Sequence, residues 1–172
     1  VILVPVTIEF TSPIEVTRNV TIIGVGGPDV ALRDAGAPLG RPLFLHGGAL
    51  RLESLHLLHS ASSLPCAACG GTPLYIDCAG PVIYAYQAHL ELDGCTVRDT
   101  RQGFLGAIMM TTSSAIVTNS TFTRLYAVLA PAIYAYGGSW LTVASSSFQD
   151  NEARDYCAAS FTCALSKLSL SA

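Results

Sequence analysis

A short apolar pattern recurs along this chain of 172 residues and restricts its fold more than any other feature. The pattern reads apolar-x-apolar-x-x-(apolar or small)-x-apolar. Its copies begin at Val20, Leu50, Leu90, Ala115, Leu141 and Cys163, with longer steps after the first two copies than after the later ones. The first copy takes Val25 as its third position, and the last takes Leu168 and Leu170 as its third and fourth. Such spacing indicates a repeat protein in which each copy stacks on the next.

The alternation within each copy is typical of a strand with one buried face. A two-residue interruption then predicts a tight bend, as at Asp93-Gly94, Thr118-Asn119 and Ala144-Ser145. Asp, Asn and Gly suit such a bend because they adopt left-handed backbone conformations at low cost.

A third strand precedes these two in the clearest copies. Its apolar anchors are Ile83, Ile108 and Ile133, which are evenly spaced in the sequence. Three short strands in roughly 25 residues predict an all-β, right-handed, single-stranded parallel β-helix of about six coils. Each strand would pair with its equivalent in the next coil, about 4.8 Å away.

The main alternative folds fit less well. A β-sandwich needs hairpins, but the chain has no Asn-Gly and a single Asp-Gly, which lies inside the repeat. A helical repeat fails because no segment keeps apolar residues at the period of an α-helix over several turns.

The whole of 1–172 is therefore expected to be one β-helix domain, or a fragment of a longer one. The longest step between copies, from Leu50 to Leu90, predicts a loop insertion at 60–80, which carries three cysteines. Leu168 and Leu170 lie next to the chain end, where a solenoid needs a cap. We therefore expect a fragment, or end-to-end stacking on another copy or on a partner.

Several features favour an extracellular or cell-surface location. The six cysteines are an even number, and two glycosylation sequons begin at Asn19 and Asn119. Asn119 lies in a predicted bend, where it could instead hydrogen-bond along the stack. The net charge of −3, with nine Lys and Arg and no basic run, argues against nucleic acid as a partner. No apolar run approaches the about 20 residues of a membrane span.

The cysteines leave three interpretations open. The disulfide candidates are Cys66, Cys69, Cys78, Cys157 and Cys163. Cys66, Cys69 and Cys78, together with Cys95, could instead bind zinc or remain free thiols. Cys95 occupies an inward position of the repeat and is expected to act as a small buried apolar group.

Two segments resemble known families. Val20–Gly27, followed by Pro42–Leu52, looks like the first coils of pectin-lyase-like β-helix proteins. Gly47-Gly48-Ala49-Leu50 and Phe148-Gln149-Asp150-Asn151 resemble the Gly-Gly-Ala-aliphatic and Phe-x-x-Asn elements of polymorphic outer-membrane-protein repeats. The resemblance spans about residues 14–170. It implies the fold, and it is degenerate, since Phe122-Thr123-Arg124-Leu125 departs from Phe-x-x-Asn.

The resemblance also implies which catalytic signatures to look for. Enzymes of this fold use clustered Asp pairs with Gly-His-Gly, or Ca²⁺-binding Asp residues with an Arg base. The chain has no Asp-Asp pair and no Gly-His-Gly, so we expect no catalytic residues and no cofactor. Asp99, Arg124 and Asp150 occupy the same repeat position in three successive copies. They are expected to form a charge-alternating ladder rather than an acid–base site.

A stripe of tyrosines is the candidate binding surface. If Ile83 and Ile133 point inward, alternation directs four tyrosines outward, with Met109 between them. These are Tyr84, Tyr86, Tyr134 and Tyr136. They could stack on sugar rings, dock a partner, or be covered by the chain's own loop.

The four histidines are not expected to form a metal site. They are His46, His56, His59 and His89. The favoured function is a non-catalytic scaffold or adhesion module that meets other extracellular proteins or glycans. The alternative is a fragment of a carbohydrate-active enzyme.

Overall fold

The chain folds into a parallel β-solenoid. The computed structural model describes residues 1–27, 29–34, 43–59, 80–100, 106–127, 129–153, 161–164 and 167–171. These residues form three sheets of parallel strands and one short strand pair, with no helix among them. The described ranges accordingly hold no helix able to cross a bilayer.

Each sheet collects one strand from every coil. The first sheet has the order β1 (Ile2–Val4), β4 (Val20–Gly24), β7 (Ala49–Glu53), β10 (His89–Asp93), β13 (Ser114–Thr118), β17 (Trp140–Ala144) and β21 (Lys167–Ser171). The second contains β2 (Ile8–Phe10), β5 (Ala31–Asp34), β8 (His56–His59), β11 (Thr96–Arg98), β14 (Thr121–Thr123) and β18 (Ser147–Gln149). The third contains β3 (Ile14–Val16), β6 (Leu43–His46), β9 (Ile83–Tyr86), β12 (Ile108–Thr111), β16 (Ile133–Tyr136) and β20 (Phe161–Ala164). The short pair is β15 (Tyr126–Ala127) with β19 (Glu152–Ala153).

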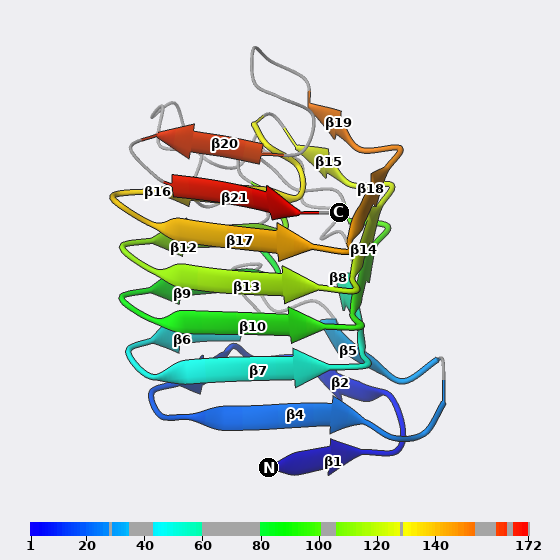
Figure 1. The fold of residues 1–172 in the computed structure, drawn as a ribbon. Helices are drawn as coiled ribbons and strands as arrows, with labels where there is room; N and C mark the ends of the chain where they lie inside the picture. Colours follow the sequence, from blue (N-terminus) through cyan, green and yellow to red (C-terminus); the bar gives the residue numbers. More distant parts are fainter. Residues whose placement is uncertain are drawn as a thin grey trace, which may run out of the picture.

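The path of the chain shows the handedness of the solenoid. In Figure 1 the first sheet faces the viewer and its strands run to the right. The chain then turns back through the second sheet and returns leftward along the third, while rising from the N-terminus to the C-terminus. This sense is right-handed, as predicted.

Like residues lie over like residues, which confirms the predicted register. Leu92 pairs with Val117, and Val117 pairs with Val143. Ile108 lies between Ile83 and Ile133 in the third sheet. All of these side chains are at most 4% exposed, so aligned apolar columns build the core.

The bends between the first and second sheets contain residues in the left-handed backbone conformation, also as predicted. Gly94, Asn119 and Ser145 have φ of 61°, 51° and 48°. After each bend, a small residue points inward. The hydroxyl of Ser120 accepts the N–H of Cys95 at 3.1 Å, so the hydroxyl satisfies a backbone donor of the neighbouring coil.

The predicted phase of the first repeat copy is wrong at its third position. Val25 is 52% exposed rather than inward. Val30 takes the expected place instead. Its carbonyl accepts the N–H of His56 at 2.9 Å, just as the carbonyl of Leu55, the third-position residue of the next copy, accepts the N–H of Thr96 at 2.9 Å. The bend between Gly24 and Val30 thus contains an insertion.

The predicted phase of the last copy is wrong as well. Leu168 pairs with Leu141 and Leu170 with Val143, so these leucines occupy the first two positions of the repeat. The coil count differs slightly as well, since β1, β2 and β3 form a coil before the first recognised copy, and β1 brings the first sheet to seven strands.

The first three strands form one end of the described solenoid. Their apolar side chains Ile2, Ile8 and Ile14 are 49%, 38% and 39% exposed. End-to-end stacking stays a prediction. Residues 60–79 of the predicted insertion lie outside the described residues.

Candidate functional site

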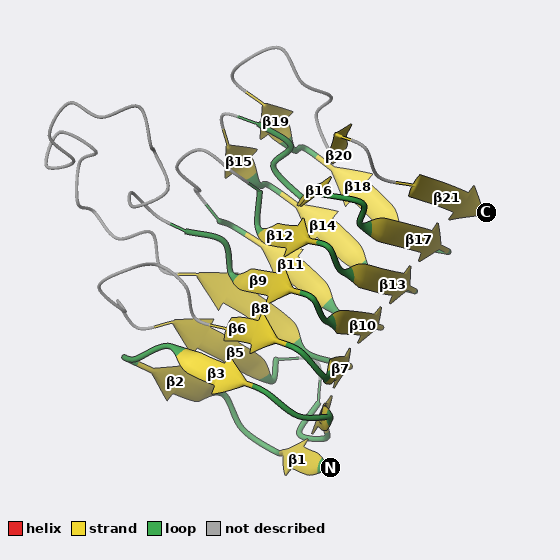
Figure 2. Cartoon of the chain, turned by 90° about the vertical axis from the view of Figure 1, so that its left-hand side faces the viewer, coloured by secondary structure: helices red, strands yellow, loops and turns green. Residues whose placement is uncertain are grey.

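The outer face of the third sheet carries the candidate binding surface. Strands β6, β9, β12 and β16 alternate, with inward residues such as Ile83 and Ala85 fully buried. Their other side chains point outward and form what we call the aromatic face: Phe44, His46, Tyr84, Tyr86, Met109, Thr111, Tyr134 and Tyr136. The third sheet is turned toward the viewer in Figure 2. The four predicted tyrosines are therefore brought onto one surface.

The aromatic face consists of two columns parallel to the solenoid axis. Phe44, Tyr84, Met109 and Tyr134 follow one another in the first column. The second column contains His46, Tyr86, Thr111 and Tyr136. Both columns span four successive coils, or about 14 Å at the strand spacing of a sheet.

Ring contacts link neighbouring rings both along and across the columns. The centroids of Phe44 and Tyr84 are 5.3 Å apart, and those of His46 and Tyr86 are 5.4 Å apart. Tyr134 and Tyr136 contact each other across the columns at 5.5 Å. These distances are those of favourable aromatic pairs, so the rings support one another.

Met109 and Thr111 fill the coil between the two tyrosine pairs. Met109 is 8% exposed, whereas the four tyrosines are partly buried. The Tyr84 and Thr111 hydroxyls lie 3.5 Å apart. The face therefore combines apolar ring surface with hydroxyl groups that can donate and accept hydrogen bonds.

Phe44 and His46 were missed in the sequence. Leu43-Phe44-Leu45-His46-Gly47-Gly48 shares its alternation with Ile133-Tyr134-Ala135-Tyr136-Gly137-Gly138. That shared pattern, inward apolar and outward aromatic before two glycines, was the signal that could have found them.

Asp99 and Arg124 form one pair of the predicted ladder, whose third member is Asp150. Arg124 Nε and Nη2 donate to the two carboxylate oxygens of Asp99 at 2.6 and 2.9 Å. This hydrogen bonding, followed by the charges of Arg124 and Arg98, holds the pKa of Asp99 below its usual value. Asp99, Arg124 and Asp150 all have left-handed φ, of 56°, 53° and 53°, so the ladder follows the bend at the end of the second sheet.

The two sequon asparagines are both exposed and both hydrogen-bonded to a neighbouring coil. Asn119 Nδ2 donates to Asp93 Oδ1 at 2.9 Å, and this bond is the main cause that lowers the pKa of Asp93. Asn19 Oδ1 accepts the N–H of Ala49 at 3.0 Å. Asn119 thus bonds along the stack, and glycosylation of either residue stays a prediction.

Cys95 is a buried free thiol at the inward position of its bend. Its Sγ lies 3.3 Å from the carbonyl oxygen of Leu52, and burial raises its pKa to about 11. Cys66, Cys69, Cys78 and Cys157 lie outside the described residues, as does the side chain of Cys163. Their pairing stays a prediction.

The histidines lie on three different sheets, in β6, β8 and β10. Within the described ranges, no cluster of three His, Cys, Asp or Glu side chains has metal-binding geometry.

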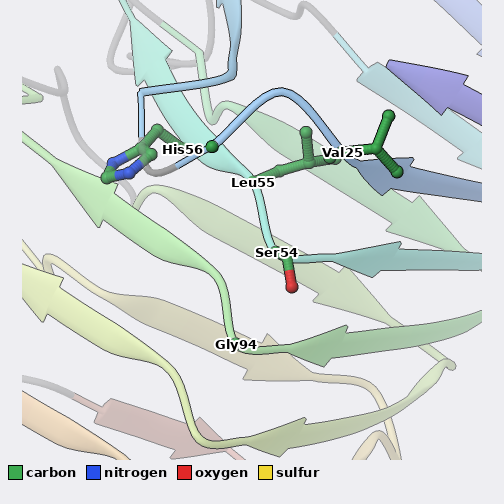
Figure 3. Close-up of a pocket in the computed structure, with 7 residues that line it drawn as sticks. Val25, Ser54, Leu55, His56 and Gly94 are labelled. Carbon is green, nitrogen blue, oxygen red and sulfur yellow. The ribbon is translucent and has the colours of Figure 1, made fainter. Parts of the chain in front are cut away.

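The insertion between Gly24 and Val30 opens a pocket beside β8, at the bend between the first and second sheets (Figure 3). The pocket is lined by Gly24, Val25, Gly27, Ser54, Leu55, His56 and Gly94. Figure 3 shows the Ser54 hydroxyl and the His56 ring pointing in different directions. The two side chains therefore do not form a nucleophile–base pair.

Comparison with known proteins adds no relative: no family model, no curated protein and no solved structure matches the chain. The parallel β-solenoid is shown by the strand pairing itself.

Proposed function

We propose that this chain is a non-catalytic β-helix module of an extracellular or cell-surface protein, and that its aromatic face binds glycans. The observation that carries the proposal is the pair of outward columns on β6, β9, β12 and β16. The even number of cysteines and the two sequons support the location.

The chemistry of the aromatic face suits a sugar. The C–H faces of a pyranose ring are apolar and pack on aromatic rings, while its hydroxyl groups need hydrogen-bond partners. Tyr84, Tyr134 and Tyr136 supply both, because a tyrosine presents an apolar ring and a polar tip. The paired rings are held by the sheet, so little side-chain entropy is lost on binding.

The charged side chains support a scaffold rather than an enzyme. An active site needs several polar groups aimed at one reacting atom. Arg124 is instead bound to Asp99, and Arg51 contacts Glu53 and Glu91 at 3.3 and 3.4 Å. These contacts lie on exposed surfaces and link neighbouring residues or coils.

The resemblance to pectin-lyase-like proteins and to polymorphic outer-membrane-protein repeats belongs to the same proposal. Gly47 and Gly48, in the Gly-Gly-Ala-aliphatic element, have φ of 65° and 78°. Asn151, in the Phe-x-x-Asn element, donates to the Phe122 carbonyl and accepts the Leu125 N–H, both at 3.1 Å. Both elements thus have a structural role within a coil: the glycines adopt left-handed backbone conformations, and the asparagine hydrogen-bonds the backbone.

A glycan array tests the proposed function. We expect selective binding by the intact chain and its loss in a Tyr134→Ala/Tyr136→Ala double variant. Ile116→Ala is the matched control, because Ile116 is 40% exposed on the first sheet, away from the aromatic face. Binding unchanged in the double variant would remove the aromatic face from the proposal. Turnover of polygalacturonate with Ca²⁺ would contradict a non-catalytic module.

A further inference from the structure

A groove runs along the corner where the chain passes from the third sheet to the first. In most coils two residues make this corner, as Thr112 and Ser113 do between Thr111 and Ser114. Between Tyr136 and Trp140 there are three residues, so this coil carries one extra. Gly138 has φ of 79°, and no heavy atom lies within 4 Å of the position its Cβ would occupy. The glycine keeps the groove open.

The floor of the groove is rigid and its polar groups are satisfied. Ala88 and Ser113 line it and are buried, and Ser139, between Gly138 and Trp140, is buried as well. The Ser113 hydroxyl accepts the N–H of Ala88 at 3.2 Å and donates to the Thr111 carbonyl at 2.8 Å. The Ser139 hydroxyl makes the equivalent pair of hydrogen bonds in the next coil. It accepts the N–H of Ser113 and donates to the Tyr136 carbonyl. A ligand would therefore meet a preformed surface, which lowers the cost of binding.

The two rims differ in chemistry. On the corner side, Gln87 and Thr112 are exposed and polar, and both have φ of 50°. On the first-sheet side, His89, Ser114 and Trp140 follow one another on paired strands. From His89 to Trp140 this rim spans two strand spacings, or about 10 Å.

The first-sheet rim is ordered by hydrogen bonds. His89 Nε2 lies 3.1 Å from Glu91 Oε1, and His89 Nδ1 lies 2.7 Å from Ser114 Oγ. In a neutral imidazole, Nε2–H donates to the carboxylate and Nδ1 accepts from the Ser114 hydroxyl. Beyond Ser114, Trp140 is 59% exposed.

We propose that this groove is a binding site for a neutral oligosaccharide, with one sugar ring packed on the Trp140 indole. A large, exposed aromatic ring beside hydroxyl, amide and imidazole groups provides the apolar and hydrogen-bonding contacts that a pyranose requires. Among the described residues, the side chains that line the groove carry no carboxylate or guanidinium, which disfavours a charged ligand. The lining residues come from four successive coils, so the groove has the length for a chain of sugars rather than one. This site lies on a different surface from the aromatic face and does not depend on it.

Trp140 is the only tryptophan in the chain, so its fluorescence reports directly on this groove. The probes are neutral linear hexasaccharides of β-1,4-linked glucose, of β-1,4-linked N-acetylglucosamine, of β-1,4-linked mannose and of α-1,4-linked glucose. We expect at least one to shift or quench the emission saturably, with a Kd below about 1 mM. The same titration is expected to be unchanged in Tyr134→Ala/Tyr136→Ala, which separates this site from the aromatic face.

Calorimetry then tests the role of the indole. Trp140→Ala is expected to weaken the binding about tenfold or more, whereas Ile116→Ala, an exposed apolar control on the same face, is expected to leave it unchanged. Far-UV circular dichroism checks that each variant stays folded. No saturable change with any of the four sugars up to about 10 mM, or an affinity that Trp140→Ala leaves intact, would overturn the proposal.

Discussion

The stacked rings of Phe122 and Phe148 offer a sharp test of how the coils hold together. Phe122 is completely buried, and its ring centroid lies 4.7 Å from that of Phe148 with an angle of 10° between the planes. The two residues are paired across β14 and β18 although a full repeat separates them in sequence. Truncating either ring leaves a gap between two coils.

The cost can be estimated from burial. Phe122→Ala removes a fully enclosed ring and is expected to lower the free energy of unfolding by about 3–5 kcal/mol. Phe148 is partly exposed, so Phe148→Ala is expected to cost less, about 1–2 kcal/mol. The double variant should cost less than the sum, because the ring pair itself contributes about 0.5–1.5 kcal/mol.

The assay is urea unfolding of the four proteins at equilibrium, followed by circular dichroism with the m-value compared throughout. Leu45→Ala is the control partner for Phe122→Ala, since Leu45 is equally buried but lies in a distant coil. That control pair should be additive to within about 0.5 kcal/mol. A Phe122–Phe148 coupling no larger than the control, or a cost below about 1 kcal/mol for Phe122→Ala, would refute the reasoning.

Three further outcomes are expected. Because Arg124 holds the pKa of Asp99 down, their ion pair stabilises the fold above about pH 4 and loses this effect as the pH falls through the lowered pKa. Urea unfolding should show Arg124→Ala only slightly destabilised at neutral pH, and not at all in strong acid; a deficit that persists in acid would contradict the ion-pair account. Cys95, with a pKa raised to about 11 by burial, should resist iodoacetamide in mildly alkaline buffer until urea unfolds the chain, as peptide mass mapping can show; rapid native labelling would place the thiol at the surface. Gly24→Ala would drive a Cβ into the Ser54 carbonyl oxygen, so the Tm of thermal unfolding should fall by several degrees, and an unchanged Tm would mean that the two backbones approach less closely.

The fold could be predicted where repeat spacing is regular. Between Ile83 and Val143 the coils have nearly constant length, so inward columns and left-handed bends follow directly from the pattern. The outward direction of the tyrosines could be predicted from the same alternation. With Ile83 directed inward, its neighbours along the strand must point outward, and the opposite assignment would have buried them.

Prediction failed where residues are inserted. The insertion between Gly24 and Val30 moves the third inward position from Val25 to Val30, and both are valines, so sequence alone gives no preference between them. At the other end, Leu165, Leu168 and Leu170 suit several phases of the repeat, and only strand pairing shows that Leu168 lies beside Leu141.

The corner groove had no recognisable sequence signal. Trp140 alternates like any outward strand residue, and the extra glycine before it reads as an ordinary turn. The site arises because residues from successive corners, among them Gln87, Thr112 and Gly138, line one groove. That juxtaposition depends on the exact length of each corner, which the repeat pattern leaves undetermined.

Contacts between methyl groups of successive coils test the stacked register most directly. In a ¹³C-edited NOESY spectrum of the methyl-labelled chain, we expect cross-peaks from Leu92 to Val117 and from Val117 to Val143. Absence of both, while each methyl shows contacts to other buried side chains, would contradict the solenoid and every surface derived from it.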